Sequence, residues 1–278
     1  EDVIALTRRV GGVDVARANR EGFATGAVMR ALNRPMEYNG QEYPCFLWKT
    51  DSLFREDELL IAGVRVTEVD AADAWSFTRA EIEGRQQMEW VLQRLREEVP
   101  GFEKAYLVGI SAQIGIRETR HVLGEHLLQE QELLDGVRFP DVIAQGTYPV
   151  DIHNPRGRGI LFKNLDGKVH EVLADGSSRN GFWTADGKER DTPCYQVPYR
   201  SLVPKGIENL LVAGRCISAT HEAAGAIRVM VNCMQFGQAA GAAAALCARS
   251  GCAPRDLAVT DLHRLLAEQG CRFLGIQA

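Results

Sequence analysis

The stretch from Ala213 to Gly251 combines a glycine turn with a helix of small side chains. A turn such as AGRC at Ala213–Cys216 lets backbone amides approach a phosphate or a polar ring without interference from side chains. We expect Asn232 to cap the following helix and its amide-rich end to stabilise negative charge. Gly237 and Gly241 predict a flat groove for close contact. The alternative is a tightly packed core helix without a ligand.

Two further patterns carry side chains that bind anions or move protons. Arg117 and Arg120 stand three residues apart in GIRETRHVLGEH, which places them on one face of a helix. There they bind an anionic group or form an ion-paired surface. In YPVDIHNP, His153 follows Asp151 by two residues, and Pro155 stiffens the segment. A histidine in this setting is a proton donor or a hydrogen-bonded structural residue.

Composition narrows the class of protein. The 278 residues carry a formal net charge of −5 with scattered basic residues, which argues against nucleic-acid binding. The most apolar stretch, Cys233–Ala248, contains Gln235 and Gln238 and is shorter than the roughly 20 residues that a membrane span needs. The 7 cysteines form no CxxC pair and the 6 histidines have no metal-ligand spacing. The sequence therefore predicts a cytoplasmic protein with reduced thiols and no metal site.

Hydrophobic periodicity predicts the elements before Asp151. The alternation at Arg65–Val69 indicates a half-buried strand. Thr78 and Glu81 form a T-x-x-E capping box, which predicts a helix from Thr78 to about Val99. A second helix is expected from Glu118 to Leu128. The apolar stripe of the first helix consists of Ile82, Val91, Leu92, Leu95 and Val99.

The elements after Asp151 are a β-rich middle followed by a strand, a turn and helices. Three Asp-Gly pairs between Arg156 and Gly187 indicate hairpin turns. The apolar run NLLVAG at Asn209–Gly214 is typical of a fully buried strand in a parallel sheet. A last helix is expected between a Thr260 cap and Gly270. The sequence therefore predicts a mixed α/β (α+β) fold.

The run ENLLVAGRCISATHEAAGAIRVMVNCMQFGQAAGAAAA at Glu208–Ala245 carries a family resemblance. It is similar to the C-terminal flavin-binding segment of FAD-dependent oxidoreductases of the fumarate-reductase/glutathione-reductase type. Motifs in the same order, including TRAEIEGRQQ, PGFEKAYL and YPVDIHNP, extend the resemblance over residues 60–270. It implies a β-rich and helical substrate-binding domain joined to the C-terminal strand–helix portion of a Rossmann-like FAD-binding domain.

The resemblance also implies roles for individual residues. Arg228 matches the arginine that holds the substrate carboxylate in fumarate reductase, and its planar charged fork suits an anionic substrate; the alternative is a structural salt bridge with Glu222. His221, in the same loop, is an acid, a base or a hydrogen-bonding residue, and Tyr199 and Arg200 line the same pocket. The implied FAD contacts are Ala213, Gly214, Arg215, Cys216, Val229, Met230, Asn232, Cys233 and Met234.

One family motif has no counterpart in this sequence. Family members open with a strand, a GxGxxG turn and a helix that hold the FAD pyrophosphate. The present chain has Gly11 and Gly12 without that fingerprint, and it begins with Glu1. We therefore expect a fragment, a processed product or a subunit, with GxGxxG on a second polypeptide or a missing N-terminal segment. We also expect an oligomer.

These observations lead to an expected organisation and function. Residues 1–200 are expected to form a substrate or cap domain, 201–250 the C-terminal part of the FAD-binding domain, and 251–278 a helical arm. The expected function is FAD-dependent hydride transfer to or from an anionic, carbonyl-bearing or hydroxyl-bearing small molecule. The alternatives are the substrate-binding subunit of a split flavoenzyme and a non-catalytic binding or scaffold protein that has lost FAD.

Overall fold

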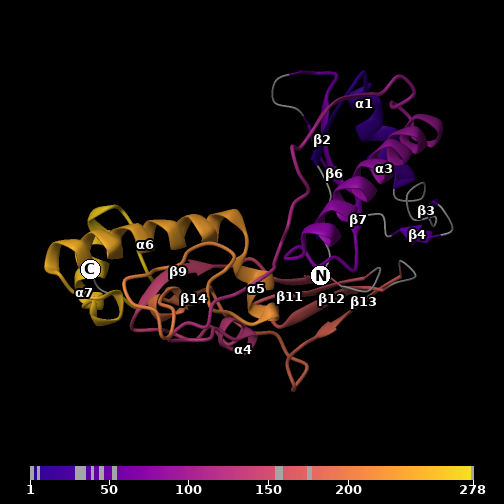
Figure 1. Cartoon of the computed structure of the whole chain (residues 1–278). Coiled ribbons are helices and arrows are strands. Elements are labelled where there is room, and N and C mark those ends of the chain that lie inside the picture. Colours follow the sequence, from indigo (N-terminus) through magenta and orange to yellow (C-terminus); the bar gives the residue numbers. More distant parts are fainter. Residues whose placement is uncertain are drawn as a thin grey trace. The chain divides into compact units, whose positions relative to one another are not determined.

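The computed structural model describes residues 3–4, 7–28, 36–38, 41–43, 47–51, 55–153, 159–173 and 177–276. The chain forms two compact units (Figure 1). Unit 1 comprises 1–119 with 154–159 and 174–176, and unit 2 comprises 120–153, 160–173 and 177–278. These packing units differ from the ranges 1–200, 201–250 and 251–278, which refer to parts of the family's fold and stay a prediction.

Unit 1 contains an antiparallel sheet and one long helix. The sheet has the order β5-β6-β2-β8, and a core of buried aliphatic side chains from the sheet and the helix α3 holds the unit together. The bounds are β2 Thr7–Gly11, β5 Leu47–Asp51, β6 Leu59–Gly63, β8 Tyr106–Ile110 and α3 Ala74–Glu98. Two short ladders pair β1 (Val3–Ile4) with β7 (Arg65–Val66), and β3 (Met36–Tyr38) with β4 (Gln41–Tyr43).

Helix α3 begins earlier than its sequence predicts. The side chain of Asp73 accepts a hydrogen bond of 2.7 Å from the Ser76 N–H and caps the helix. The Thr78 hydroxyl, already inside the helix, donates to the Ala74 carbonyl at 2.7 Å instead. The predicted capping box is therefore wrong, because an earlier side chain satisfies the first free amides. Of the predicted stripe, Ile82 is 56% exposed, whereas the other four members are buried.

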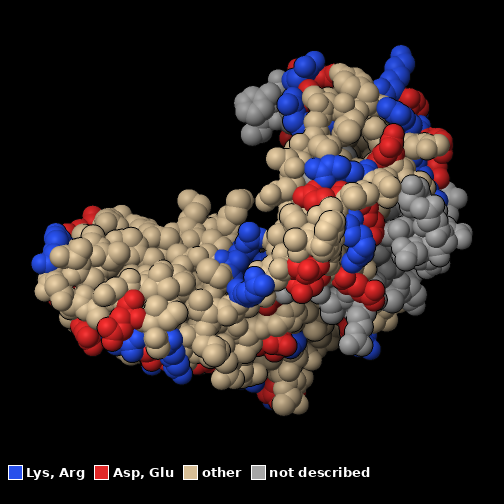
Figure 2. Space-filling model, viewed as in Figure 1, with Lys and Arg blue, Asp and Glu red and all other residues tan. Residues whose placement is uncertain are grey.

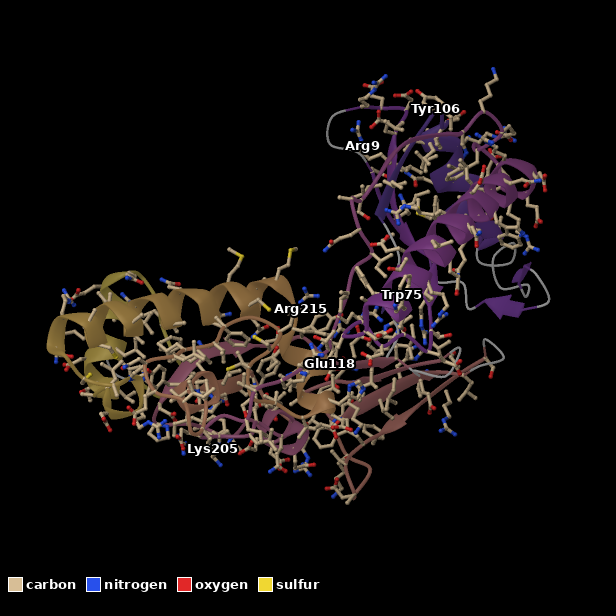
Figure 3. The ribbon with its side chains drawn as sticks, viewed as in Figure 1. Arg9, Trp75, Tyr106, Glu118, Lys205 and Arg215 are labelled. Atoms are coloured by element: carbon tan, nitrogen blue, oxygen red, sulfur yellow. The ribbon has the colours of Figure 1, made fainter. Side chains whose placement is uncertain are left out.

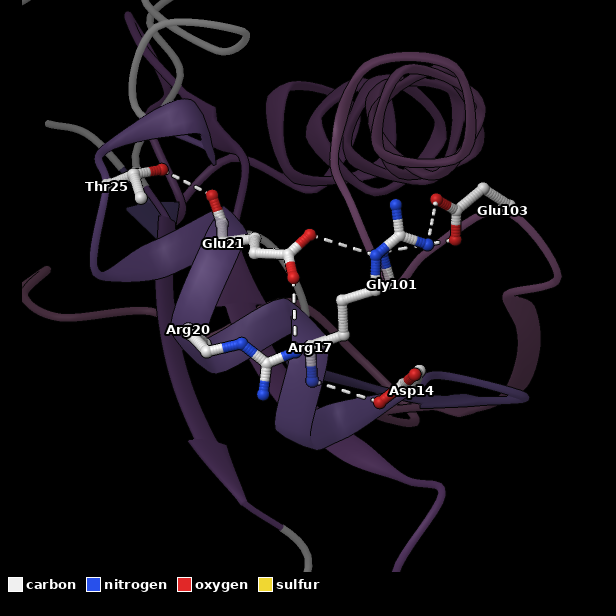
Figure 4. Close-up of polar contacts among 7 residues, drawn as sticks. All are labelled: Asp14, Arg17, Arg20, Glu21, Thr25, Gly101 and Glu103. Atoms are coloured by element: carbon white, nitrogen blue, oxygen red, sulfur yellow. Dashed lines mark hydrogen bonds and ion pairs between the residues drawn. The ribbon is translucent and has the colours of Figure 1, made fainter.

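Ion pairs stabilise the segment of unit 1 that follows strand β2 (Figure 4). Helix α1 (Val15–Arg17) leads into the π-helix η1 (Ala18–Phe23). Arg17 pairs with Glu21 at 3.0 Å and with Glu103 at 2.9 Å, and the Asp14 carboxylate accepts from the Arg17 N–H at 2.9 Å. Glu103 also accepts from the Gly101 N–H at 3.1 Å. Gly11 and Gly12 thus precede a structural corner rather than a phosphate-binding turn.

Strand β7 is shorter than the predicted strand. It covers only Arg65 and Val66, because Glu68 has a positive φ of 56° that breaks an extended chain.

Unit 2 contains an antiparallel meander and a separate two-stranded ladder. The meander runs β10-β11-β12-β13, and β9 pairs with β14. The bounds are β9 Val142–Gly146, β10 Val150–His153, β11 Ile160–Lys163, β12 Lys168–Val172, β13 Ser178–Phe182 and β14 Tyr195–Pro198. The predicted β-rich middle is confirmed, with the turn at Gly167 having φ 91°. Pro155 and the pair Asp175–Gly176 lie outside the described residues.

Helices cover the ladder of unit 2. Helix α6 lies along β9 and against α7, and its buried residues Phe236, Ala239 and Ala243 belong to the core of the unit (Figure 1). The α-helices are α4 Glu130–Leu134, α5 His221–Ile227, α6 Met230–Ser250 and α7 Val259–Glu268, with 3-10 turns η2 Tyr199–Leu202 and η3 Pro254–Asp256. The mixed α and β fold is therefore confirmed.

Two predicted elements of unit 2 are wrong. Residues 120–128 are not helical, because their amides bond to distant carbonyls: Val122 to Cys216 at 3.0 Å and Glu125 to Val203 at 2.9 Å. The run NLLVAG is not a strand, and Val212 donates to Leu202 at 2.9 Å outside any ladder. Every ladder among the named strands that the structure describes is antiparallel.

Two predicted caps are also wrong. Helix α7 has Ala258 at its N-cap, so Thr260 lies inside the first turn. Helix α6 starts at Met230 behind Val229, and Asn232 is therefore its third residue rather than its cap.

None of the helices in the described ranges has both the length and the apolar character that crossing a membrane requires.

Candidate functional site

The junction between α5 and α6 brings the predicted substrate and cofactor residues next to each other. The Thr220 hydroxyl caps α5 by accepting from the Ala223 N–H at 3.3 Å. Arg228 closes α5, and Val229 is extended with φ −67° and ψ 152°, so the chain turns directly into α6 at Met230. Arg228 therefore lies two residues before the first turn of a 21-residue helix.

A buried carboxylate organises the side chains at this junction. We call Tyr148, Asp151, His153 and Arg228 the Asp151 cluster. Asp151 Oδ2 accepts from Arg228 Nη2 at 3.0 Å and from the Tyr148 hydroxyl at 3.0 Å. Asp151 Oδ1 lies 3.2 Å from His153 Nε2. The side chains of Asp151 and Arg228 are 7% and 15% exposed, so the pair is largely removed from water.

Gly225 explains how α5 approaches the strand that carries Asp151. A Cβ at position 225 would lie 2.9 Å from the main-chain oxygen of Asp151, closer than real Cβ contacts come. Glycine is therefore the residue that lets α5 press directly on β10. This contact delivers Arg228 to the carboxylate, because Arg228 Nη2 also donates to the Asp151 carbonyl at 3.2 Å.

The two predicted cofactor segments also meet. The exposed Arg215 lies near enough for its positive charge to affect the Cys233 thiol. The Cys233 thiol lies 3.4 Å from the Arg228 carbonyl. Burial raises the pKa of Cys233, and the positive charge of Arg215 opposes that rise. Figure 3 shows Arg215 beside the start of α6. Gly214 has φ 88° with open space at its Cβ position, which gives the AGRC segment its turn.

The outward face of α6, which we call the α6 platform, is apolar. Met230, Val231 and Met234 are 82%, 67% and 73% exposed. Farther along, Gly237 and Gly241 have no atom within 4 Å of their Cβ positions. On the visible face the surface over α6 carries no charge along most of its length (Figure 2). An apolar, uncharged face suits the flat ring of a flavin.

The N-terminus of α6 adds hydrogen-bond donors to this platform. In the part of the chain that the structure describes, no side chain caps the helix and no acidic residue lies in its first turn. The first backbone N–H groups of a helix have no partner within the helix, and they carry partial positive charge. The face, the donors and the nearby Arg215 together fit the apolar ring and the electron-rich pyrimidine edge of FAD.

Asn232 does not contribute its side chain to that face. The residue is 2% exposed, and its Oδ1 accepts from the Tyr195 hydroxyl at 3.2 Å inside unit 2. The Tyr195 hydroxyl is also 3.1 Å from the Ala226 carbonyl. Burial raises the pKa of Tyr195, so the phenol stays protonated and links α5 to α6.

The structure places the remaining predicted residues on irregular segments, on η2 and at the start of α5. Residues 117–128 are not helical, so the single helical face predicted for Arg117 and Arg120 does not form. Tyr199 is 2% exposed, and its hydroxyl donates to the Pro254 carbonyl at 2.9 Å. With Arg200 it lines a separate cavity of about 630 Å³. His221 is the exposed first residue of α5.

The sequence reasoning missed Asp151 and Tyr148 as members of the site. Asp151 stands two residues before His153 on β10, a spacing that puts both side chains on one face of a strand. That spacing was the available signal. Arg228 forms a salt bridge, which was the alternative to substrate binding, but its partner is Asp151 and not the expected Glu222. No group of three or more metal-ligating side chains occurs in the described ranges.

Comparison with known proteins identifies the family of the chain. A family model described as FAD dependent oxidoreductase matches residues 4–266. The chain therefore belongs to the FAD dependent oxidoreductase family, and the resemblance seen in its sequence is confirmed. No curated protein and no solved structure matches the chain.

Proposed function

We propose that this chain forms the ring-binding and substrate-binding part of a flavin oxidoreductase that acts on an anionic, carbonyl-bearing or hydroxyl-bearing small molecule. The observation that carries the proposal is the position of Arg228, which is held by Asp151 and stands directly before the uncapped N-terminus of α6. The charge proposed to bind the substrate, on Arg228, and the backbone amides proposed to contact the cofactor, in the first turn of α6, thus belong to neighbouring residues.

The residues that would hold the cofactor are those of the α6 face and the AGRC segment. The apolar side chains of Met230 and Met234 would support the ring, and the amides of the first turn would contact its polar edge. FAD, when bound, supplies two-electron exchange with a substrate placed against the ring. The protein contributes orientation, exclusion of water and a positive electrostatic field at the helix end.

The Asp151 cluster would serve the substrate. The contacts that the described residues make with the Arg228 guanidinium engage Nη2, and its remaining N–H groups can form a fork for a carboxylate or a developing oxyanion. His153 sits beside the same carboxylate, which orients its ring for hydrogen bonding or proton transfer. Arg228 and His153 are therefore the proposed binding and proton-transfer residues.

The adenosine and pyrophosphate half of FAD requires a different site. The 278 residues contain no GxGxxG turn. We propose that another polypeptide or a segment outside these residues supplies that turn, and that it covers the open face of α6 in the assembled, cytoplasmic enzyme. The exposed Met230, Val231 and Met234 support this arrangement, because contiguous apolar surface is usually buried in an assembly.

A comparison of riboflavin with FAD tests the proposal. If this chain contacts only the ring, the purified chain should bind the two with affinities within about threefold of each other, and weakly. Binding is measured by quenching of flavin fluorescence. Met234→Glu should weaken both, because it places a charge on the platform. Leu123→Glu is the matched control, since Leu123 and Met234 are both 73% exposed. FAD binding more than about thirtyfold tighter than riboflavin binding would contradict the division of the site.

A further inference from the structure

The far end of α6 closes with a left-handed glycine. Gly251 has φ 70°, and its N–H donates to the Cys247 carbonyl at 2.8 Å. In this type of helix ending, the side chain four residues before the glycine meets the side chain directly after it. Those positions are Cys247 and Cys252. The backbone motif therefore brings two thiols together where other helices place an apolar contact.

The two thiols interact with each other and with a neighbouring hydroxyl. Cys247 is 8% exposed, and the half-buried Cys252 lies near enough for its thiol to affect the pKa of Cys247. Ser250 Oγ lies 3.2 Å from Cys252 Sγ and 2.9 Å from the Leu246 carbonyl. Burial, followed by the contact with Cys252, raises the pKa of Cys247 to about 11. Both sulfurs are free thiols.

The pair is reachable by small molecules. Cys247 and Cys252 line an open cavity of about 520 Å³ together with Leu211, Ala240, Ala244 and Pro254. Its lining consists mainly of small or apolar side chains, which leave the sulfurs accessible to an uncharged reagent such as hydrogen peroxide.

We propose that Cys247 and Cys252 are a redox-active pair that closes to an intramolecular disulfide at the end of α6. Hydrogen peroxide is the oxidant. The more exposed Cys252 sulfur attacks one peroxide oxygen, the O–O bond breaks, and a sulfenic acid and water form. The Cys247 sulfur then displaces the hydroxyl group of that sulfenic acid, which leaves as a second water. The two sulfurs lose two electrons, and the peroxide gains them.

The disulfide would fix the end of the helix. The cross-link joins residues on both sides of Gly251, and it therefore holds the left-handed turn and the start of η3 in one arrangement. Because burial disfavours the Cys247 thiolate, the second step, in which Cys247 attacks, should be slow at neutral pH and faster as the pH rises toward 9 and above. The pair stands at the end of α6 opposite the proposed flavin turn.

Tryptic mapping of the full chain tests this inference. Trypsin cleaves after Arg249, so a disulfide between the two residues joins the peptide 229–249 to the peptide 250–255. After treatment with hydrogen peroxide and alkylation, we expect this linked pair, a loss of two alkylated thiols, and full reversal by dithiothreitol. Because Cys233 lies in the same first peptide, the experiment is repeated in Cys233→Ser, which should keep the link.

Variants supply the controls. Cys252→Ser should abolish the link, whereas Cys194→Ser, a half-buried thiol elsewhere in unit 2, should leave it unchanged. Circular dichroism verifies that each variant is folded. The inference is overturned if folded wild-type chain keeps both thiols alkylatable after peroxide, or if Cys252 is converted to sulfinic acid without a link to Cys247.

Discussion

Removal of the Asp151 carboxylate provides the sharpest check on the candidate site. In Asp151→Ala, the guanidinium of Arg228, 15% exposed, loses its charged partner at 3.0 Å. Breaking a buried ion pair by deleting one member costs about 3–5 kcal/mol, because the remaining charge stays desolvated. The Tyr148 hydroxyl is in a 37% exposed residue and can bond to water, so its loss adds little. We therefore expect unit 2 to lose about 3–5 kcal/mol of unfolding free energy.

The assay must follow unit 2 separately from unit 1. Trp183 lies in unit 2, whereas Trp48, Trp75 and Trp90 lie in the range of unit 1. Denaturant unfolding followed by the ¹⁹F resonance of labelled Trp183 therefore reports the relevant transition.

A double-mutant cycle isolates the ion pair. Arg228→Met removes the buried charge while it keeps an unbranched side chain of moderate length. In the double variant with Asp151→Ala, the part of the loss that comes from the desolvated guanidinium should be recovered, since that charge is removed as well. A single-variant loss below about 1 kcal/mol, or a coupling below about 0.5 kcal/mol, would refute the reasoning that a desolvated pair holds the site together.

Three other predictions concern the same unit. Gly225→Ala should destabilise unit 2 by about 1–3 kcal/mol, because its Cβ would meet the backbone of Asp151 at 2.9 Å; Trp183 unfolding measures it, and an unchanged midpoint would contradict it. Arg228→Lys should lower turnover per bound flavin in the assembled enzyme by about ten- to a hundredfold with flavin content unchanged, because lysine lacks the planar fork; wild-type turnover per flavin would remove Arg228 from the site. Burial raises the pKa of Cys247 from 9.0 to about 11, so folding favours the neutral thiol; that stabilisation is complete below pH 9 and is lost as the pH rises toward 11. The unfolding free energy of the wild-type chain should therefore fall by on the order of 1–3 kcal/mol between pH 9 and 11, and that of Cys247→Ala should fall by less. An equal pH dependence of the unfolding free energy in the two proteins would contradict the raised pKa of Cys247.

Local signals in the sequence predicted the elements whose hydrogen bonds are local. The end of the long helix at Pro100-Gly101 and the hairpin at Asp166-Gly167 depend on residues adjacent in sequence, and both are found near their predicted places. The family resemblance came from the run Glu208–Ala245 and the motifs before it, and a family model over residues 4–266 confirmed it.

Features that depend on distant contacts were not predictable in the same way. Residues 120–128 have helical composition, but carbonyls near Val203 and Cys216 take their amides. An Asn at the start of a helix indicates a cap, yet Tyr195, far away in sequence, draws the Asn232 side chain inward. The partner of Arg228 was missed for the same reason, since Asp151 and Arg228 are 77 residues apart.

The contact at Gly225 has a consequence for genetics. The atoms that a methyl group at position 225 would meet are the oxygen, carbon and nitrogen of the Asp151 main chain, not its side chain. A second substitution at position 151 therefore cannot relieve the clash. Suppressors of Gly225→Ala are expected instead among residues that shift the strand as a whole, along the β10–β11 ladder from Val150 to Lys163. Position 225 is thus constrained by the path of a neighbouring chain segment, and an evolving sequence can change it only by moving that segment.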